Sequence, residues 1–471
     1  MTSLFMAAWA AAARASSPRS RYRTVLPISV SERFLLAEMI ETILEKVKRR
    51  GASAEVFLTE RAASEISFES GKLKNAEQKT VLGIGLRVIR EDRIGFSSTT
   101  DPHRIEDLVE NALDASRFGK EVHFEFPGEA IAAGYGTATF DPAVESYSPA
   151  QAISEGKRAV DILRERCPKG LTDLSISTAV NKVRIANTAG FDASYSSTDF
   201  REYITLVVVE GDSILWIGDG NHFGALDIRT DAYVERIAAL AGHAEKKAPR
   251  ISGMLPVIFT AQEMPSLMQA FEMGIDGRRL VKGDSPLIGR EGEKILGDVT
   301  LADDPYIEGS PGSRPFDDEG MPSQLTMIFE EGVFRSFLFN LDTAAQAGRV
   351  STANAQRGLL SAPTVGTSNL VMSPGKSSLK EMIESIDEGV IVHGVLGGGQ
   401  SNLLAGDFAL NIMLGFLVRN GEISGRLVDT MVSGNVYQAF GSIDASGSDV
   451  KPVGSIFVPD VMFSALSISS R

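Results

Sequence analysis

Apolar residues recur at helical spacing near the start of the chain. They are Phe34, Leu35, Ile40, Ile43, Leu44 and Val47. Spacings of three and four residues place such side chains on one face of an α-helix. Ser29 and Glu32 have the spacing of a capping box, and Gly51 suits the position just after a last helical turn. The pattern therefore predicts an amphipathic helix that ends before Gly51.

The next residues follow an alternating pattern instead. The alternating runs occupy residues 54–60, 64–70, 81–92 and 94–99, each bounded by glycine or polar residues. Alternation of this kind predicts a meander of antiparallel strands. Asp101 and Pro102 have the order of a helix N-cap and a first-turn proline, and apolar residues from Ile105 to Leu113 supply one face. Helix, strands and helix together predict an N-terminal α/β domain over residues 28–125.

A second unit of similar composition follows a glycine-rich boundary at about residues 126–142. Helices are predicted over residues 148–166 and 230–247, the first of them opened by a serine N-cap and a proline. Five strands linked by asparagine and glycine turns are predicted between these helices, at residues 171–180, 182–190, 191–199, 201–211 and 213–220. This unit is interpreted as a central α/β domain over residues 143–248.

From residue 252 onward the chain is mostly strand-like, with helical stretches near residues 262–275 and 377–386. Many short strands joined by glycine turns predict a curled or barrel-like antiparallel sheet. This part is interpreted as a C-terminal β-rich domain over residues 252–471. The predicted fold class is α+β: N-terminal α/β units of antiparallel strands with flanking helices, followed by a mostly antiparallel, curled or barrel-like C-terminal β domain.

Charge and cysteine content narrow the functional classes. The 47 lysines and arginines face 61 aspartates and glutamates, which gives a formal net charge of −14. A field of this sign repels phosphate backbones, so direct nucleic-acid binding is disfavoured. The single cysteine, Cys167, rules out an intramolecular disulfide and indicates a reducing, cytoplasmic location. It precedes a proline and has no histidine nearby in sequence, so we interpret it as an ordinary thiol.

The first 27 residues differ from the rest, because they are rich in alanine, serine and arginine and contain no acidic residue. A signal peptide has basic residues before its apolar run, whereas here the arginines follow it. We interpret residues 1–27 as a disordered or mis-annotated leader that is dispensable for folding. No later stretch reaches the roughly 18 uncharged apolar residues of a membrane span, so no membrane association is expected.

Several motifs in the C-terminal region point to a known family. They are Asp303 to Pro305, PFDDEG at 315–320, FNLDTA at 339–344 and GGGQSNLLAGDF at 397–408. The runs at 69–88 and 186–190 supply similar motifs earlier in the chain. In this order and spacing they resemble the TldD/PmbA family, historically called modulators of DNA gyrase, and its PmbA (TldE) branch. The resemblance implies a subunit of a two-chain zinc metalloprotease that acts on unfolded or extended peptides.

In the TldD branch, the resemblance implies a zinc site formed by an HExxxH helix and a later cysteine, with the glutamate as general base. Anchoring on Lys282 and Gly283 places Met268, Gln269 and Met273 at the positions of the histidines and the glutamate. A thioether is a poor zinc ligand, and an amide cannot act as a base at neutral pH. We therefore expect no metal or cofactor in this chain, and we expect the zinc on a TldD-like partner.

The histidines of the chain support this expectation. They are His103, His123, His222, His243 and His393, and none has a second histidine within two helical turns. The C-terminal region also lacks a cysteine. A noncatalytic relative of a zinc enzyme would show such a loss of all ligands, although folding could still assemble a site from distant residues.

Four methionines lie close together in the sequence, at positions 254, 264, 268 and 273. They could form an adaptable peptide-binding face, because methionine is flexible and polarizable. Methionine at helical spacing is more often part of a core, and we favour the core interpretation.

The PFDDEG motif brings Asp317, Asp318 and Glu319 together. Three adjacent carboxylates could form a Ca²⁺ or Mg²⁺ site or a pair of catalytic groups. The simpler interpretation, which the residues alone favour, is a charged turn between strands. The family resemblance implies instead that the motif flanks the active cleft, as a channel or interface feature.

The glycine-rich motif near residue 400 lacks the lysine of a phosphate-binding loop. Its glycines would let another backbone approach closely, as an added peptide strand requires. A tight turn or bulge is the alternative interpretation. The candidate peptide-channel or interface residues of this motif are Gly397, Gly398, Gly399, Asn402 and Asp407.

Three functional hypotheses follow. The leading one is a zinc-free PmbA/TldE-like subunit that binds a TldD-like metalloprotease chain and extended peptides. The second is a stand-alone binding or regulatory protein without protease activity. The third, an independently active hydrolase that uses Asp317 or Glu319, lacks a visible nucleophile or metal set.

Overall fold

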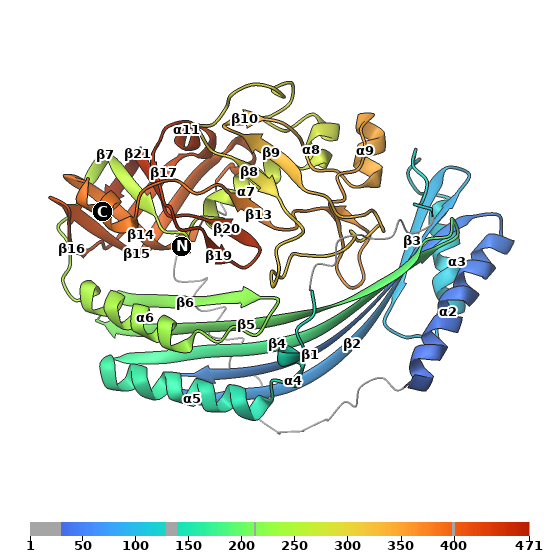
Figure 1. Ribbon diagram of the computed structural model, residues 1–471, viewed down its shortest axis with the longest axis horizontal. Coiled ribbons are helices and arrows are strands. Elements are labelled where there is room, and N and C mark those ends of the chain that lie inside the picture. The colour runs from blue at the N-terminus through green and yellow to red at the C-terminus, as the bar shows by residue number, and fades with distance from the viewer. Residues whose placement is uncertain (1–29, 129–138, 212, 398–400, 471) are drawn as a thin grey trace.

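The computed structural model describes residues 30–128, 139–211, 213–397 and 401–470. A long curved sheet and a rounded C-terminal domain face each other, with helices on the outer side of the sheet (Figure 1). Within the described residues, no helix is both long enough and apolar enough to cross a membrane. The prediction of an α+β fold is confirmed.

Six antiparallel strands form the long sheet. They are β1 (Ser53–Glu69), β2 (Lys72–Arg90), β3 (Arg93–Thr99), β4 (Gly170–Asn187), β5 (Asp192–Glu210) and β6 (Ser213–Phe223). Their order is β3-β2-β1-β4-β5-β6, so the two N-terminal sequence units contribute three strands each to one sheet. The pairing of β1 with β4, from Glu55 opposite Asn187 to Phe68 opposite Leu174, joins the two halves.

The sequence predicted short strands where the structure has long ones. Residues 54–60 and 64–69 both lie in β1, and the runs predicted from 171 to 211 merge into β4 and β5. Polar residues that resembled turn signals instead bond to one another across the sheet. Arg61 Nη1 donates to Asn181 Oδ1 at 2.6 Å and to Asp199 Oδ2 at 2.7 Å. Side chains that satisfy each other within the sheet let the backbone ladder continue without a turn.

Helices cover one face of this sheet. They are α2 (Val30–Arg49), α3 (Ile105–Ser116), α4 (Pro142–Ser146), α5 (Pro149–Arg166) and α6 (Thr230–Ala244). Ser148 and Gln151 form a complete capping box at the start of α5. The predicted N-cap at Asp101 is wrong, because α3 begins four residues later. Asp101 Oδ1 accepts a hydrogen bond from the backbone N–H of His103 at 2.9 Å, which stabilises a turn before the helix.

The C-terminal domain contains a closed five-stranded barrel. Its strands are β7 (Ser252–Phe259), β14 (Glu388–Gly397), β15 (Asp407–Arg419), β17 (Thr430–Asn435) and β21 (Val461–Ser470). The ring closes through the pairing of β14 with β15, so the predicted barrel-like sheet is confirmed. Strands β16 (Glu422–Arg426) and β18 (Ile443–Ser446) extend it.

A second sheet lies beside the barrel, in the order β10-β9-β8-β13-β20-β19. Its strands are β8 (Leu301–Asp303), β9 (Thr326–Glu330), β10 (Val333–Phe334), β13 (Leu370–Met372), β19 (Lys451–Val453) and β20 (Ile456–Val458). The short strands β11 (Ala355–Gln356) and β12 (Thr364–Val365) form a separate hairpin. The remaining helices are α7 (Pro265–Gly274), α8 (Gly277–Lys282), α9 (Leu341–Ala347), α10 (Leu379–Glu384), η1 (Leu403–Ala405) and α11 (Val436–Gly441).

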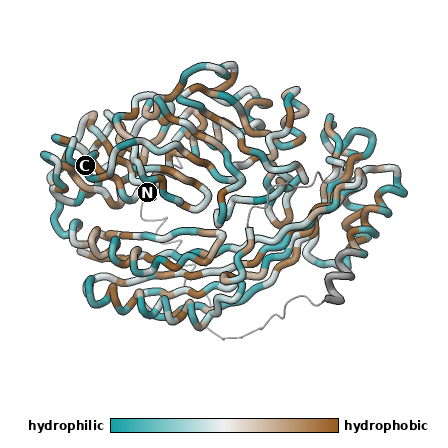
Figure 2. Tube along the Cα trace, in the orientation of Figure 1, coloured by the Kyte–Doolittle hydropathy of each residue, from teal (hydrophilic) through white to brown (hydrophobic). Residues whose placement is uncertain are grey.

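Helix α7 is embedded in the core of the C-terminal domain. Leu267, Met268 and Phe271 are fully buried there, and the Phe271 ring stacks edge-to-face on Phe329 and Phe440. Brown, hydrophobic positions recur through the interior of this domain in Figure 2, whereas the outer turns of α5 are mainly teal. The core interpretation of the methionines is confirmed for Met264 and Met268, but it is wrong for Met254, which is 65% exposed.

Candidate functional site

The PFDDEG motif forms a buried loop between β8 and β9. Asp317 and Glu319 are fully buried and Asp318 nearly so, so the motif is not an ordinary charged surface turn. Asp317 Oδ1 accepts hydrogen bonds from the backbone N–H groups of Glu319 and Met321 at 2.9 and 3.0 Å. Its Oδ2 accepts from the N–H of Ala355 at 2.9 Å. Asp317 therefore ties its own loop to the β11–β12 hairpin.

The charge of Asp317 is not balanced by these contacts. Burial, and then the neighbouring Glu319 carboxylate, raise the pKa of Asp317 above its ordinary value. Arg314, which is also buried, opposes this effect, and its guanidinium lies 3.7 Å from the Asp318 carboxylate. Both oxygens of Asp317 already bind backbone donors, so this carboxylate serves the loop geometry better than catalysis or metal binding.

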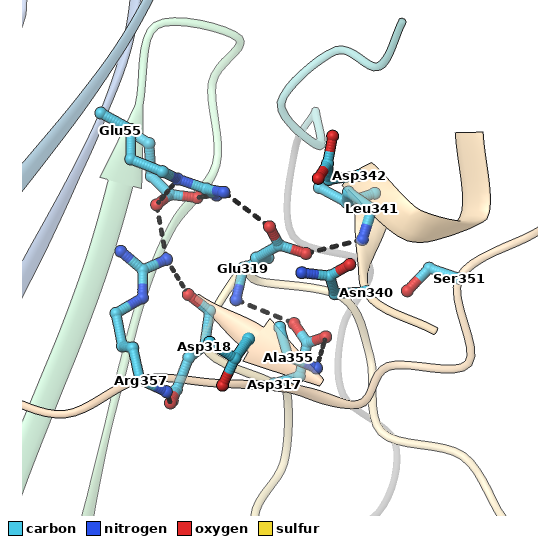
Figure 3. A network of polar contacts seen from close by, with 12 residues as sticks. Glu55, Asp317, Asp318, Glu319, Asn340, Leu341, Asp342, Ser351, Ala355 and Arg357 are labelled. Carbon is cyan, nitrogen blue, oxygen red and sulfur yellow. Dashed lines mark hydrogen bonds and ion pairs between the residues drawn. The ribbon is translucent and has the colours of Figure 1, made fainter. Parts of the chain in front are cut away.

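Glu319 belongs to a buried network that connects the two parts of the molecule (Figure 3). Arg87, on β2, donates from Nη1 to Glu319 Oε1 at 2.6 Å and from Nη2 to Glu55 Oε2 at 2.7 Å. Arg357, from the hairpin, donates to Glu55 Oε1 at 2.7 Å and also to the Asp318 carbonyl. Glu319 Oε2 accepts from the N–H of Leu341 at the start of α9. We call Glu55, Arg87, Glu319 and Arg357 the interdomain ion cluster.

Burial would raise the pKa of Glu55, but the charges of Arg87 and Arg357 outweigh it and hold that pKa below its ordinary value. Aromatic rings enclose the guanidiniums, with Phe126 at 5.3 Å from Arg87 and Phe57 at 4.4 Å from Arg357. Each charge in the cluster has an opposite charge as a direct partner. The arrangement fits a structural contact between the long sheet and the C-terminal domain.

The glycine-rich motif is only partly described. Gly398 and Gly399 lie outside the described residues, while Gly397 ends β14 with a φ of +118° that favours glycine. Asn402 caps η1, and Asp407 begins β15, where its Oδ1 accepts from Asn435 Nδ2 at 2.9 Å. Helix η1 packs against α7. The structure thus brings Asn402 and Asp407 near α7, whereas Asp317 to Glu319 contact the long sheet.

Strand β7 does not accompany β14 as far as this motif. Strand β7 pairs only with Val390 to Val392 of β14, leaving the following residues without that neighbour. Glu263 Oε2 accepts from the N–H of Val395 at 3.1 Å. Burial raises the pKa of Glu263 to about 7. A role for this edge in peptide binding remains a prediction.

Helix α7 lines a pocket of ≈ 360 Å³. The lining residues are Gln269, Glu272, Met273, Ile275, Asp276, Arg278, Arg279, Leu338, Gln356, Val365, Gly366 and Thr367. Gln269, Glu272, Met273 and Asp276 follow helical spacing, so one stripe of α7 and the turn after it forms a wall. The opposite side of the lining comes from the β11–β12 hairpin and the residues after it.

The residues of α7 do not fit a zinc ion. Met268 is packed in the core and contributes nothing to the pocket, while Gln269 and Met273 supply an amide and a thioether. Among the described residues, no group of three or more histidine, cysteine, aspartate or glutamate side chains is placed to hold a metal ion. No reaction step through zinc can be built on these side chains.

Sequence reasoning missed Glu55, Arg87 and Arg357 as partners of the PFDDEG motif. It also missed Glu272, although a signal was present, because Glu272 is the only ionisable residue within α7. A single carboxylate on an otherwise apolar and neutral helix has to be paired, exposed or directed into a pocket.

Three domain matches cover most of the chain. "PmbA/TldA metallopeptidase domain 1" matches residues 54–116, the "central domain" matches 142–245, and the "C-terminal domain" matches 252–470. A metalloprotease of Methanothermobacter thermautotrophicus is 27% identical over 88% of this chain and 92% of its own length. The metalloprotease PmbA of Escherichia coli O157:H7 is 24% identical over 94% of this chain and 97% of its own length.

Solved structures share the fold. TldE from Thermococcus kodakarensis superposes with a TM-score of 0.84 at 23% identity, over 92% of this chain and all of that one. A putative modulator of a DNA gyrase from Thermotoga maritima also gives a TM-score of 0.84, at 25% identity and the same coverage. These matches define a metalloprotease-like protein built from three consecutive domains. The chain belongs to the PmbA/TldD family, and its resemblance to the PmbA/TldE branch is confirmed.

Proposed function

We propose that this chain is the PmbA/TldE-like subunit of a two-chain TldD/TldE-type zinc metalloprotease that acts on unfolded or extended peptides. In this assembly the zinc and the general base belong to a TldD-like chain. The present chain completes the enzyme without holding a metal. The relatives that are named as metalloproteases include both PmbA and a TldD homologue.

The observation that carries the proposal is the chemistry of α7. The family resemblance, anchored on Lys282 and Gly283, places Met268 at the first histidine position and Gln269 at the glutamate position, and Met268 is fully buried in the core. A zinc site in a hydrolase needs histidine, cysteine or carboxylate ligands together with an open coordination position. A buried thioether supplies neither the ligand nor the access, so the metal chemistry is assigned to the partner.

The test is to purify the chain alone, the TldD-like chain alone, and the two together. Zinc content and cleavage of an unstructured peptide are measured for each. We expect no stoichiometric zinc and no cleavage for the present chain alone, and zinc-dependent cleavage for the pair. One zinc per chain, lost together with activity when His222 or His243 is replaced, would overturn the proposal.

The same experiment examines the stand-alone alternative. If the two chains elute separately and the pair cleaves no better than the TldD-like chain alone, a binding or regulatory role without protease activity gains support. A regulatory role need not involve DNA contact, because the formal net charge of −14 repels phosphate backbones.

A further inference from the structure

The pocket beside α7 combines an apolar surface with a small set of polar groups. Its apolar lining comes from Met273, Ile275, Leu338 and Val365. Glu272 and Thr367 are among the polar groups, and Thr367 Oγ1 donates to Glu272 Oε1 at 2.9 Å. Its volume of ≈ 360 Å³ lies at the small end of the range for ligand sites. It therefore suits one side chain or one chain end rather than a long segment.

The other charged groups of the lining already have partners. Arg278 donates from Nε and Nη2 to Asp276 at 2.5–3.1 Å, and Arg279 Nη1 donates to Asp284 Oδ2 at 3.0 Å. Two carboxylates, Asp276 and Asp284, thus each pair with one guanidinium. Both guanidiniums are committed to aspartates, so an anionic ligand would have to compete with those pairs.

Within the described parts of the chain, Glu272 is the charged side chain of the lining that has no ion-pair partner. Thr367 supplies one neutral donor, and no charged group is a cause of the shift in the pKa of Glu272. Burial raises that pKa, and the Thr367 hydrogen bond only partly opposes the rise. A largely buried carboxylate of this kind gains most from a ligand that brings both a positive charge and hydrogen-bond donors.

We propose that the pocket binds a primary ammonium group on an apolar stem, carried by a peptide, with Glu272 as its counter-ion. An ammonium offers three donors and a compact charge, and the apolar lining would enclose its stem. Two sources share this chemistry: the N-terminal amine of a peptide and the side chain of a lysine. The peptide nature of the ligand rests on the proposed function, whereas the ammonium specificity rests on the pocket.

The direct test is calorimetric binding of short peptide probes to the full chain without partner. One probe has a free N-terminus and no lysine, a second is its N-acetylated form, a third is N-acetylated with one lysine, and a fourth carries acetyl-lysine instead. We expect binding of the first or third probe and loss of at least tenfold in affinity on acetylation of the responsible amine. Equal affinity for all four probes would overturn the proposal.

Substitution of the carboxylate gives a second readout. Glu272→Gln keeps the size of the side chain and its acceptor for Thr367 but removes the charge, and it should weaken the binding probe about tenfold or more. Glu422→Gln is the matched control, because Glu422 is exposed on β16, away from the pocket. Unchanged binding by a folded Glu272→Gln protein would contradict the role of Glu272. The probe comparison on the natural chain does not depend on the folding of any variant.

The pH profile separates the two sources. The charged groups that face Glu272 are Asp276 on the same side of the pocket and Arg278 and Arg279 on α8, all paired as described. Affinity should rise with pH as Glu272 ionises, because the ammonium favours the charged carboxylate. It should fall again above about pH 8 for an N-terminal amine but only near pH 10 for a lysine.

Cleavage by the assembled pair distinguishes failure of this inference from failure of the proposed function. Glu272→Gln should raise KM for peptides that bear the recognised amine and leave kcat nearly unchanged, since the group binds but does not react. Normal KM in an active pair would overturn the ammonium site while the metalloprotease assignment stands. Absence of cleavage with the natural chains would instead count against the proposed function.

Discussion

Arg87 and Glu319 lie 232 positions apart in the sequence and form a buried ion pair, with 2.6 Å between Nη1 and Oε1. This contact joins β2 of the long sheet to the PFDDEG loop of the C-terminal domain. Removing one partner of a buried pair leaves the other charge uncompensated. The stability of the domain contact therefore depends on both residues together.

We predict that Glu319→Ala lowers the free energy of unfolding by about 3–5 kcal/mol. Glu330→Ala is the matched control, because Glu330 pairs with Arg335 at 2.9 Å on an exposed surface, and its loss should cost less than about 1 kcal/mol. Urea unfolding of both variants measures the difference. Similar midpoints for the two variants would show that the interdomain ion cluster does not stabilise the fold.

Gly83 is predicted to be necessary for docking of the β11–β12 hairpin. A Cβ added at Gly83 would lie 2.5 Å from Leu359 Cδ1 and 2.7 Å from the Leu359 carbonyl oxygen. Gly83→Ala should therefore destabilise the chain by about 1–3 kcal/mol. Gly242→Ala is the control, because Gly242 lies in α6 with open space around it, and it should stabilise by up to about 1 kcal/mol. Thermal melts that rank the two variants in the opposite order would contradict this packing.

Glu263 should make stability depend on pH. Its folded pKa is raised to about 7 by burial, so the folded chain holds this proton more tightly than the unfolded chain. Stability should then fall by about 1–3 kcal/mol as pH rises from about 4.5 to 7, and level off above that range. Glu263→Gln keeps an acceptor for the N–H of Val395 and should remove this decline. An identical pH dependence in urea titrations of both proteins would rule out Glu263 as its source.

Two methionines on α7 provide a test of the helix orientation. Met268 is fully buried in the core, whereas Met273 lines the pocket and is half-buried. Met268→Ala should cost about 2–5 kcal/mol, and Met273→Ala clearly less, because a cavity at Met273 opens toward solvent. Differential scanning calorimetry of the two variants gives the comparison. A larger loss for Met273→Ala would mean that α7 is turned differently.

Local patterns predicted the element types because they report local physics. The capping box at Ser148 and the proline after it mark the start of α5, and glycine turns in the last third of the chain indicate a curled sheet. The length of β1 was not predictable in the same way. From the sequence, a strand is predicted to end at Arg61. In the structure its partners are Asn181 and Asp199, more than 100 positions away, so the strand continues through it.

The interdomain ion cluster could not be predicted from the sequence for a related reason. Glu55 and Arg87 sit directly opposite each other on β1 and β2, on positions that alternation assigns to a solvent-facing side. That side is buried only because the PFDDEG loop and the hairpin cover it. The sequence identified Asp317 to Glu319 as candidates, but the partners depend on strand register and on contacts across domains, which no local pattern encodes.

The β11–β12 hairpin contacts both the pocket beside α7 and the long sheet. Gln356 lines the pocket beside α7, and the next residue, Arg357, reaches Glu55 in the long sheet. The residue that lines the pocket and the residue that holds the ion pair with the long sheet are therefore adjacent in the chain. We expect a displacement of the hairpin that widens the pocket on this side to strain the ion pair between Arg357 and Glu55 as well. The width of the pocket beside α7 and the position of the long sheet are therefore linked through two neighbouring residues of this hairpin.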